Sequence, residues 1–128
     1  MTMAETVLTF VTEEAQDGLE ALSRRMYEGV KASIESSGIP AIVDYVGNKG
    51  CITFFKKGIT IEPVKNYQHY IQSVDLVVET AFSFFCFNRG MWVQPRDEWS
   101  LSYQHTIEDA DSFVEVFRLF ANAIKDRY

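Results

Sequence analysis

The sequence has few of the residues that mark disulfide-rich, membrane-spanning or nucleic-acid-binding proteins. Its 128 residues include only two cysteines, three prolines and six leucines, and no uninterrupted apolar run approaches the ~18 residues of a membrane span. Lysine and arginine total 12 against 18 aspartates and glutamates, so the net charge of −6 repels phosphate backbones. We therefore expect no nucleic-acid and no membrane partner. The start of the chain shows no basic segment or cleavage-site pattern, which predicts a cytoplasmic location.

Complete catalytic and metal motifs are also absent from the sequence. There is no GxxxxGK(S/T), GxGxxG or GxSxG pattern, and the glycine-rich turn at 47–50 joins two extended runs instead of opening a helix. No two of the cysteines and histidines stand at the short paired spacing of zinc ligands, so we predict no bound metal. These four residues are Cys51, Cys86, His69 and His105. Both cysteines lie in apolar stretches, which favours buried, reduced thiols over nucleophiles or a disulfide.

Helical and extended patterns alternate along the chain. Apolar residues recur every three or four positions from Thr12 onward, and Gly38 followed by Pro40 gives a stop signal, so one long amphipathic helix is predicted. A shorter helix is expected over Met3–Phe10. The β-branched and aromatic runs Ala41–Val46 and Cys51–Phe55 predict an antiparallel hairpin.

The second half of the chain repeats this alternation. Residues 56–73 show no clear period and are predicted to form a long loop, a kind of segment that is often functional. A helix is expected from Val74 to about Arg89, followed by short extended runs at 91–93 and 99–104 on either side of a charged bend. Thr106–Asp109 has the form of a capping box that opens a last helix ending at about Ile124.

This order of elements predicts an α+β fold in a single domain spanning residues 1–128. The expected architecture is a small, mainly antiparallel sheet of three to four strands, covered by helices on one face. The chain has ten phenylalanines and only six leucines, so phenylalanine is expected to fill much of the core. A helix such as 82–87 carries phenylalanine on more than one face, which predicts an exposed apolar patch or a dimer interface.

Five segments of the chain, in order, resemble one protein family. They are GIP at 38–40, VGN at 46–48, ITFF at 52–55, FF…NRGMWV at 84–93 and PRDEWSLSYQHTIED at 95–109. Together they are similar to the C-terminal small domain of class III pyridoxal-phosphate-dependent aminotransferases, in the glutamate-1-semialdehyde 2,1-aminomutase-like branch. The resemblance covers roughly residues 12–117 and implies an aminotransferase small-domain-like fold.

The resemblance implies a cofactor that this chain does not hold by itself. In this family pyridoxal phosphate (PLP) is bound mainly by a large domain, which supplies the Schiff-base lysine, while the small domain closes over the substrate. The chain matches the small domain only, and none of its lysines lies in a segment like the one that carries the cofactor lysine. We therefore assign no catalytic and no cofactor-binding residue here, and we expect a PLP-binding large domain or subunit as partner.

Four residues are implied to line the substrate side of the cleft. They are Asn48, Arg96, Glu98 and Trp99. Arg96 would engage a carboxylate. Asp97 and Glu98 stand where the family pattern has His-Asn, so the substrate specificity of the family does not carry over.

Two functions from different classes follow. The first is the small domain of an aminotransferase or aminomutase, inactive alone, present as a fragment, a truncated product or a separately encoded subunit. The second is a non-catalytic binding or interaction module that retains this scaffold, uses Tyr67–Tyr70 and the charged bend as a contact surface, and self-associates as a homodimer. The initial Met and the chain's own N-terminal segment favour the second. An autonomous enzyme with a new site is a third possibility, although no nucleophile–base pair is visible.

Overall fold

A computed structural model describes residues 2–94 and 98–128. The described residues form an α+β fold, as predicted, with helices packed on an antiparallel sheet. In chain order the elements are α1 (Met3–Leu8), α2 (Glu13–Ser37), β1 (Ala41–Val46), β2 (Lys49–Phe54), α3 (Tyr67–Ser73), α4 (Leu76–Phe87), β3 (Glu98–Ser100), α5 (Ile107–Ile124) and the 3-10 turn η1 (Lys125–Arg127).

The long helix α2 begins and ends at the signals that the sequence contains. The side chain of Thr12 accepts a hydrogen bond from the Ala15 N–H at 3.2 Å, and Gly38 ends the helix in the left-handed conformation at φ 71°. Its N–H donates to the Ile34 carbonyl at 2.9 Å. The predicted amphipathic helix is confirmed, with one face buried against the rest of the core.

The sheet has the order β1-β2-β3, and both pairings are antiparallel. Val46 pairs with Lys49, so the hairpin turn consists of Gly47 and Asn48 only, two residues shorter than the predicted 47–50 turn. Gly47 takes φ 55°, which a residue with a side chain rarely adopts. β2 therefore begins earlier than predicted, and it places Gly50 opposite Trp99.

The prediction of two further extended runs is only partly correct. Residues 91–93 form no strand, and only Gln94 bridges to Glu98. The run expected at 99–104 leaves the sheet after Ser100. The Leu101 N–H still donates to the Asn48 carbonyl at the hairpin turn, where β2 begins, and residues 102–105 then fold into a turn. Three strands are therefore found among the described residues, at the lower end of the predicted number.

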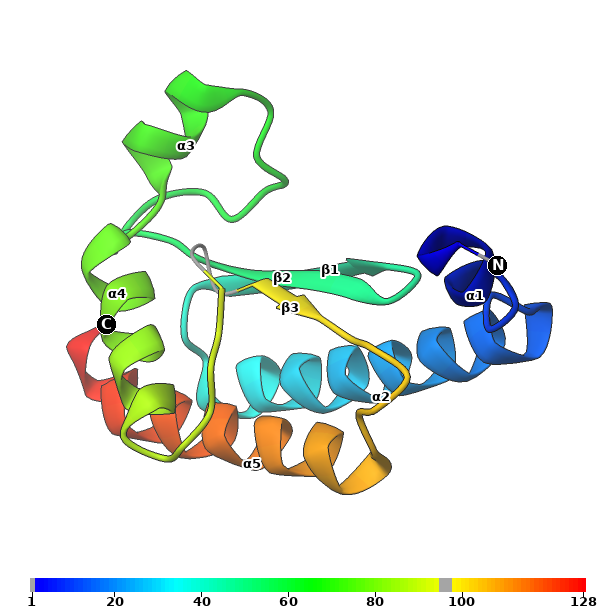
Figure 1. The fold of residues 1–128 in the computed structure, drawn as a ribbon. Coiled ribbons are helices and arrows are strands. Elements are labelled where there is room, and N and C mark those ends of the chain that lie inside the picture. The colour runs from blue at the N-terminus through cyan, green and yellow to red at the C-terminus, as the bar shows by residue number, and fades with distance from the viewer. Residues whose placement is uncertain (1, 95–97) are drawn as a thin grey trace.

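The prediction of a continuous loop at 56–73 is wrong, since its last 7 residues form the helix α3. Asn66 caps this helix by accepting a hydrogen bond from the His69 N–H at 2.9 Å. Because α3 is short and buries little apolar surface, no helical period marks it in the sequence. It projects away from the body, above the sheet in Figure 1.

The core lies between the sheet and the helices on one of its faces. α2 and α5 run side by side under the sheet, and α4 packs beside α5 (Figure 1). Phe54 of β2, Phe82 of α4 and Phe120 of α5 meet with ring centroids 5.1–5.9 Å apart. At the α2–α5 contact, a Cβ added to Gly29 would lie 2.5 Å from Cγ1 of Val114, so the close approach of the two helices depends on this glycine.

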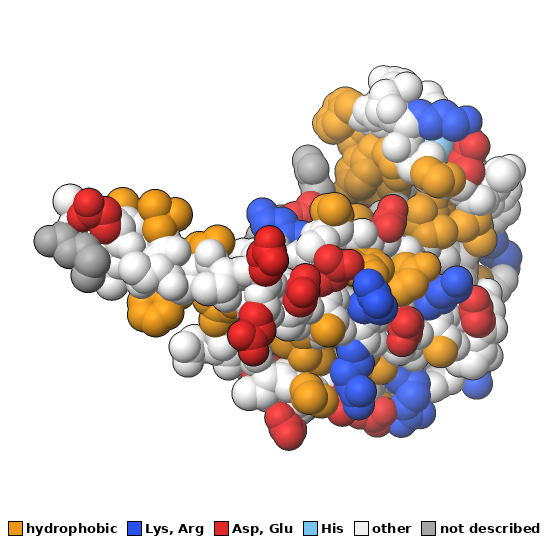
Figure 2. Space-filling model, turned by 90° about the vertical axis from the view of Figure 1, so that its right-hand side faces the viewer, with side chains coloured by type: hydrophobic (Ala, Val, Ile, Leu, Met, Phe, Trp, Pro, Cys, Tyr) orange, Lys and Arg blue, Asp and Glu red, His pale blue; other side chains and the backbone are white. Residues whose placement is uncertain are grey.

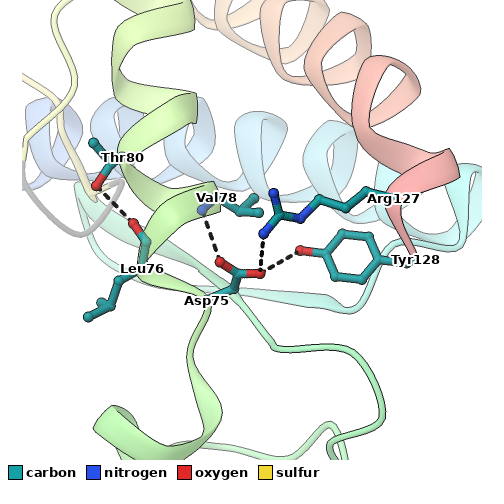
Figure 3. Close-up of polar contacts among 6 residues, drawn as sticks. All are labelled: Asp75, Leu76, Val78, Thr80, Arg127 and Tyr128. Atoms are coloured by element: carbon teal, nitrogen blue, oxygen red, sulfur yellow. Dashed lines mark hydrogen bonds and ion pairs between the residues drawn. The ribbon is translucent and has the colours of Figure 1, made fainter.

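The end of the chain is fastened to the start of α4 (Figure 3). The carboxylate of Asp75 accepts from the Val78 N–H at 3.1 Å and thereby caps α4. It also accepts from Arg127 at 3.2 Å and from the Tyr128 hydroxyl at 3.5 Å. Burial, together with the charge of Asp75, raises the pKa of Tyr128 to about 12.

The N-terminal segment projects from the body as an arm (Figure 2). Its helix α1 buries none of its residues, and apolar side chains such as Val7 and Leu8 are exposed along it. Within residues 2–94 and 98–128, no helix combines the length and the apolar character needed to cross a bilayer.

Candidate functional site

A groove of about 460 Å³ lies between the segment after α4, strand β3 and the first two turns of α5. Its polar and aromatic lining residues include Arg89, Trp92, Glu98, Trp99, His105 and Asp109. Two of the four residues implied by the family resemblance, Glu98 and Trp99, therefore lie together here. Arg96 lies outside the described residues, and Asn48 is not part of the groove wall.

Trp99 is held in the core, and little of its ring reaches the groove. It is 5% exposed, and its indole Nε1 donates a hydrogen bond to the buried Ser23 Oγ at 2.9 Å. A Cβ added to Gly50 would lie 2.1 Å from Cζ2 of Trp99, so the ring packs directly on the strand backbone. These contacts fix the ring, so the small part of it that lines the groove is held rigidly.

Asn48 is hydrogen-bonded to Leu101, which lines the groove. Its side-chain Nδ2 donates to the Leu101 carbonyl at 2.7 Å, and its own carbonyl accepts from the Leu101 N–H at 2.9 Å. This pair of bonds fastens the chain leaving β3 to the hairpin turn. In this conformation the amide of Asn48 positions the segment that carries Leu101.

His105 stands between the groove and a neighbouring cavity of about 540 Å³ beside α2, and it lines both. Its Nδ1 accepts from the Ser102 N–H at 2.9 Å and lies 3.0 Å from the Ser102 Oγ. Because Nδ1 is an acceptor, a neutral ring carries its proton on Nε2. The backbone N–H already uses the lone pair on Nδ1 that a serine nucleophile would need, so Ser102 and His105 form a turn and not a nucleophile–base pair.

The start of α5 brings an ionised carboxyl group to the groove. Thr106 and Asp109 form the predicted capping box, in which the Thr106 N–H donates to Asp109 Oδ2 at 2.8 Å. Hydrogen bonds from the Thr106 backbone and side chain lower the pKa of Asp109. Asp109 is therefore a carboxylate at neutral pH.

Residues of both charges line the groove. The guanidinium of Arg89 lies over the Phe85 ring, 3.5 Å from its centroid, and donates to the Phe85 carbonyl at 3.2 Å. Glu98 and Asp109 supply acidic side chains to the same groove. A lining with both signs of charge complements a small zwitterion better than a simple anion or cation.

The lining was only partly visible in the sequence. Trp92 stands in a run that was expected to be extended. Met91, Trp92 and Val93 are all apolar, so the sequence has no alternation to show that Trp92 is the exposed one. Arg89 was expected only as the approximate end of a helix. Ser23 had no signal, since its partner Trp99 is 76 residues away.

The groove as described does not fit PLP on its own. Among residues 2–94 and 98–128, no lysine lines it. Lys56 donates to the carbonyls of Ile71 and Gln72, and Lys65 pairs with Glu62, both far from the groove in the segment before α4. In the same described part of the chain, no three His, Cys, Asp or Glu side chains gather to hold a metal ion. A PLP-dependent reaction would need further residues to hold the cofactor.

Comparison with known proteins identifies a similar domain within larger enzymes. No family model matches the chain. It is 29% identical over 103 residues to glutamate-1-semialdehyde 2,1-aminomutase 2 of Brevibacillus brevis, which is 79% of this chain and 23% of that protein. Two structures of a glutamate-1-semialdehyde aminomutase from Pseudomonas aeruginosa, one in complex with PMP, match with a TM-score of 0.75 at 19% identity over 85% of this chain and 23% of theirs.

An omega-transaminase from Sphaerobacter thermophilus matches in the same way. Its TM-score is 0.74 at 19% identity, over 94% of this chain and 26% of that one. The chain thus spans about a quarter of the length of the relatives it matches. The sequence resemblance to aminomutases and the aminotransferase-like α+β fold are both confirmed.

Proposed function

We propose that the chain is the small, substrate-closing domain of a PLP-dependent aminotransferase or aminomutase, and that it acts only together with a large domain that holds the cofactor. One observation carries this proposal. The fold similarity extends over 85–94% of this chain but over only 23–26% of the relatives, so this chain corresponds to one part of a much larger catalytic unit.

The groove is the surface we assign to the substrate. Arg89 would attract the carboxylate of an amino acid, and Glu98 and Asp109 would attract its ammonium group. Arg96, two positions before Glu98 in the sequence, would add a second carboxylate contact. Trp99, fixed by Ser23 and Gly50, would exclude water from one wall when the domain closes. PLP, when bound by the large domain, supplies the electron sink for amino-group transfer.

The proposal is tested by a chimera in which this chain replaces the small domain of the Pseudomonas aeruginosa aminomutase. We expect the chimera to bind PLP and to transfer amino groups, whereas the same enzyme without any small domain transfers none. A folded, PLP-loaded chimera with no transfer activity contradicts the proposal. The isolated chain, mixed with PLP, is expected to give no lysine-dependent visible absorption band.

The role of the groove has its own matched pair of variants in the chimera. Glu98→Gln removes a charge from the groove and is expected to raise KM for the amino substrate. Glu108→Gln removes the same charge from an exposed position in the first turn of α5, outside the groove wall, and is expected to leave KM unchanged. Equal effects of the two changes would show that Glu98 does not contact the substrate.

A non-catalytic interaction module on the same scaffold is the second candidate. The observation that favours it is the large aromatic surface that the isolated chain leaves open, including Phe84 and Trp92. Co-purification from the native host separates the two functions. A PLP-binding large domain among the partners favours the first, and only unrelated partners favour the second.

A further inference from the structure

The outward side of α4 is a continuous uncharged surface. It consists of Val77, Thr80, Ala81, Phe84 and Phe87, which recur at three- and four-residue spacing and therefore share one face of the helix. We call these five residues the α4 stripe. Val77 is 64% exposed and Phe84 62%, and Trp92 packs edge-on against Phe87 with ring centroids 4.9 Å apart.

We propose that the α4 stripe is the interface of a homodimer, in which two copies of this chain pack α4 against α4 about a two-fold axis. This inference does not depend on the proposed function. Val77 and Phe84 lie at equal distances, in sequence, from the midpoint between Thr80 and Ala81. When two antiparallel copies cross at that midpoint, each Phe84 meets the Val77 of the other copy, as a two-fold interface requires.

The residues at the crossing point suit a close approach of two helices. Ala81 has a single methyl group, and the Thr80 hydroxyl donates to the Leu76 carbonyl within its own helix at 2.8 Å (Figure 3). The hydroxyl therefore needs no partner across the interface. Small residues at the centre with large apolar ones on either side give the alternation that interlocking helices use.

The uncharged α4 stripe is a face on which two copies can meet with little local repulsion. Each chain carries a net charge of −6, so two copies repel each other wherever their acidic surfaces meet. The α4 stripe has no charged side chain. The acidic residues at this end of α4, Asp75 and Glu79, are buried and hydrogen-bonded to groups of their own chain.

The exposed area indicates how strong the dimer is. Phe84, Phe87 and Trp92 are 62%, 40% and 77% exposed, and aromatic side chains cover ~150–250 Å² each, so these three rings offer roughly 300–450 Å² per copy. With Val77 and Leu76 added, the total for two copies approaches the ~1,000 Å² at which specific interfaces begin. We therefore expect a weak dimer that dissociates on dilution.

Sedimentation equilibrium over a wide concentration range tests the proposal. The full chain is expected to pass from monomer to dimer as its concentration rises, and a monomer at every concentration overturns the proposal. Phe84→Asp is expected to raise the Kd of dimerisation roughly 30-fold or more. The matched control is Val7→Asp, which puts the same charge on the exposed apolar arm α1 and is expected to leave the Kd unchanged.

Two further variants keep the test independent of folding defects. Val77→Lys changes the opposite side of the same contact and is expected to weaken the dimer as Phe84→Asp does. In a Cys51→Ser background, Ala81→Cys lies at the axis and is expected to form a disulfide-linked dimer under mild oxidation, whereas Glu108→Cys is not. If Val7→Asp dissociates the dimer and Phe84→Asp does not, the interface lies at α1 and the proposal is wrong. The absence of cross-linking at position 81 would also overturn it.

Discussion

The two sides of α4 carry the same kind of side chain in opposite environments. Val78, Phe82 and Cys86 face the core and are buried, whereas Val77 and Phe84 face outward and are mostly exposed. An ordinary surface helix is apolar only on its inner side, because the outer side gains nothing from apolar groups. The phenylalanines of this chain therefore lie in two environments: a packed interior, and an exposed surface on the outward side of α4.

The largest difference between the two sides is expected from removing one ring on each. Phe82→Ala leaves a cavity among Phe54 and Phe120 and is expected to lower the free energy of unfolding by ~3–5 kcal/mol. Phe84→Ala is expected to change it by less than ~0.5 kcal/mol in dilute protein. Urea unfolding followed by circular dichroism measures both. Equal losses would mean that the outer ring also belongs to the core.

A second pair compares an inward and an outward serine on α2. Ser23→Ala leaves the buried Nε1–H of Trp99 without its acceptor and is expected to cost ~1–3 kcal/mol. Ser36→Ala, on the exposed side of the same helix, is expected to stay within ~0.5 kcal/mol of the parent. Thermal and urea unfolding check the difference. A neutral Ser23→Ala would show that the indole finds another acceptor.

A third pair makes the same change, glycine to alanine, at two positions of α2 where opposite effects on stability are expected. Gly29→Ala forces a methyl group against Val114 where α2 meets α5, and is expected to destabilise by roughly 1–2 kcal/mol. Gly18→Ala meets no atom within 4 Å and is expected to stabilise the same helix by ~0.5–1 kcal/mol. The melting temperatures of the two variants should move in opposite directions. Stabilisation by both would show that the α2–α5 contact has room to spare.

The smallest expected effect concerns Tyr128 and pH. Its pKa is raised from 10.0 to about 12, so the folded state favours the neutral phenol. This contribution to stability is present below pH 10 and is lost as the pH rises from 10 towards 12. Tyr128→Phe should flatten the fall in unfolding free energy over that window. If the unfolding free energy of Tyr128→Phe fell with pH as steeply as that of the parent, ionisation of Tyr128 would not affect stability.

Local signals in the sequence predicted the elements whose ends are fixed by their own residues. Thr12, Gly38 and the Thr106–Asp109 box cap α2 and α5 where expected, because a cap is a contact within one turn. The helix α3 was missed because its one strong signal, the capping Asn66, stands without an apolar period behind it. Strand β3 is shorter than expected because its partner β2 begins at the hairpin turn, so the pairing stops there, and the chain then turns at residues 102–105.

The candidate site was less predictable because its geometry depends on distant pairs. Glu98 and Trp99 were singled out by family resemblance, and both line the groove. The sequence has no local pattern to show that Trp99 is fixed by Ser23 and Gly50, since burial and partners across the fold decide this. Asn48 was also expected beside the substrate, and the sequence has no pattern to show that its amide donates to the Leu101 carbonyl, 53 residues away.

The two tryptophans stand on opposite sides of the boundary between interior and surface. Trp99 is sealed in the core, while Trp92 is exposed beside Phe87. The protein thus contains two intrinsic fluorophores in contrasting polarity, one emitting towards the blue and shielded from acrylamide, the other emitting towards the red and open to quenching. Single-tryptophan versions of the chain would report separately on unfolding and on the covering of the surface beside α4, without any added label.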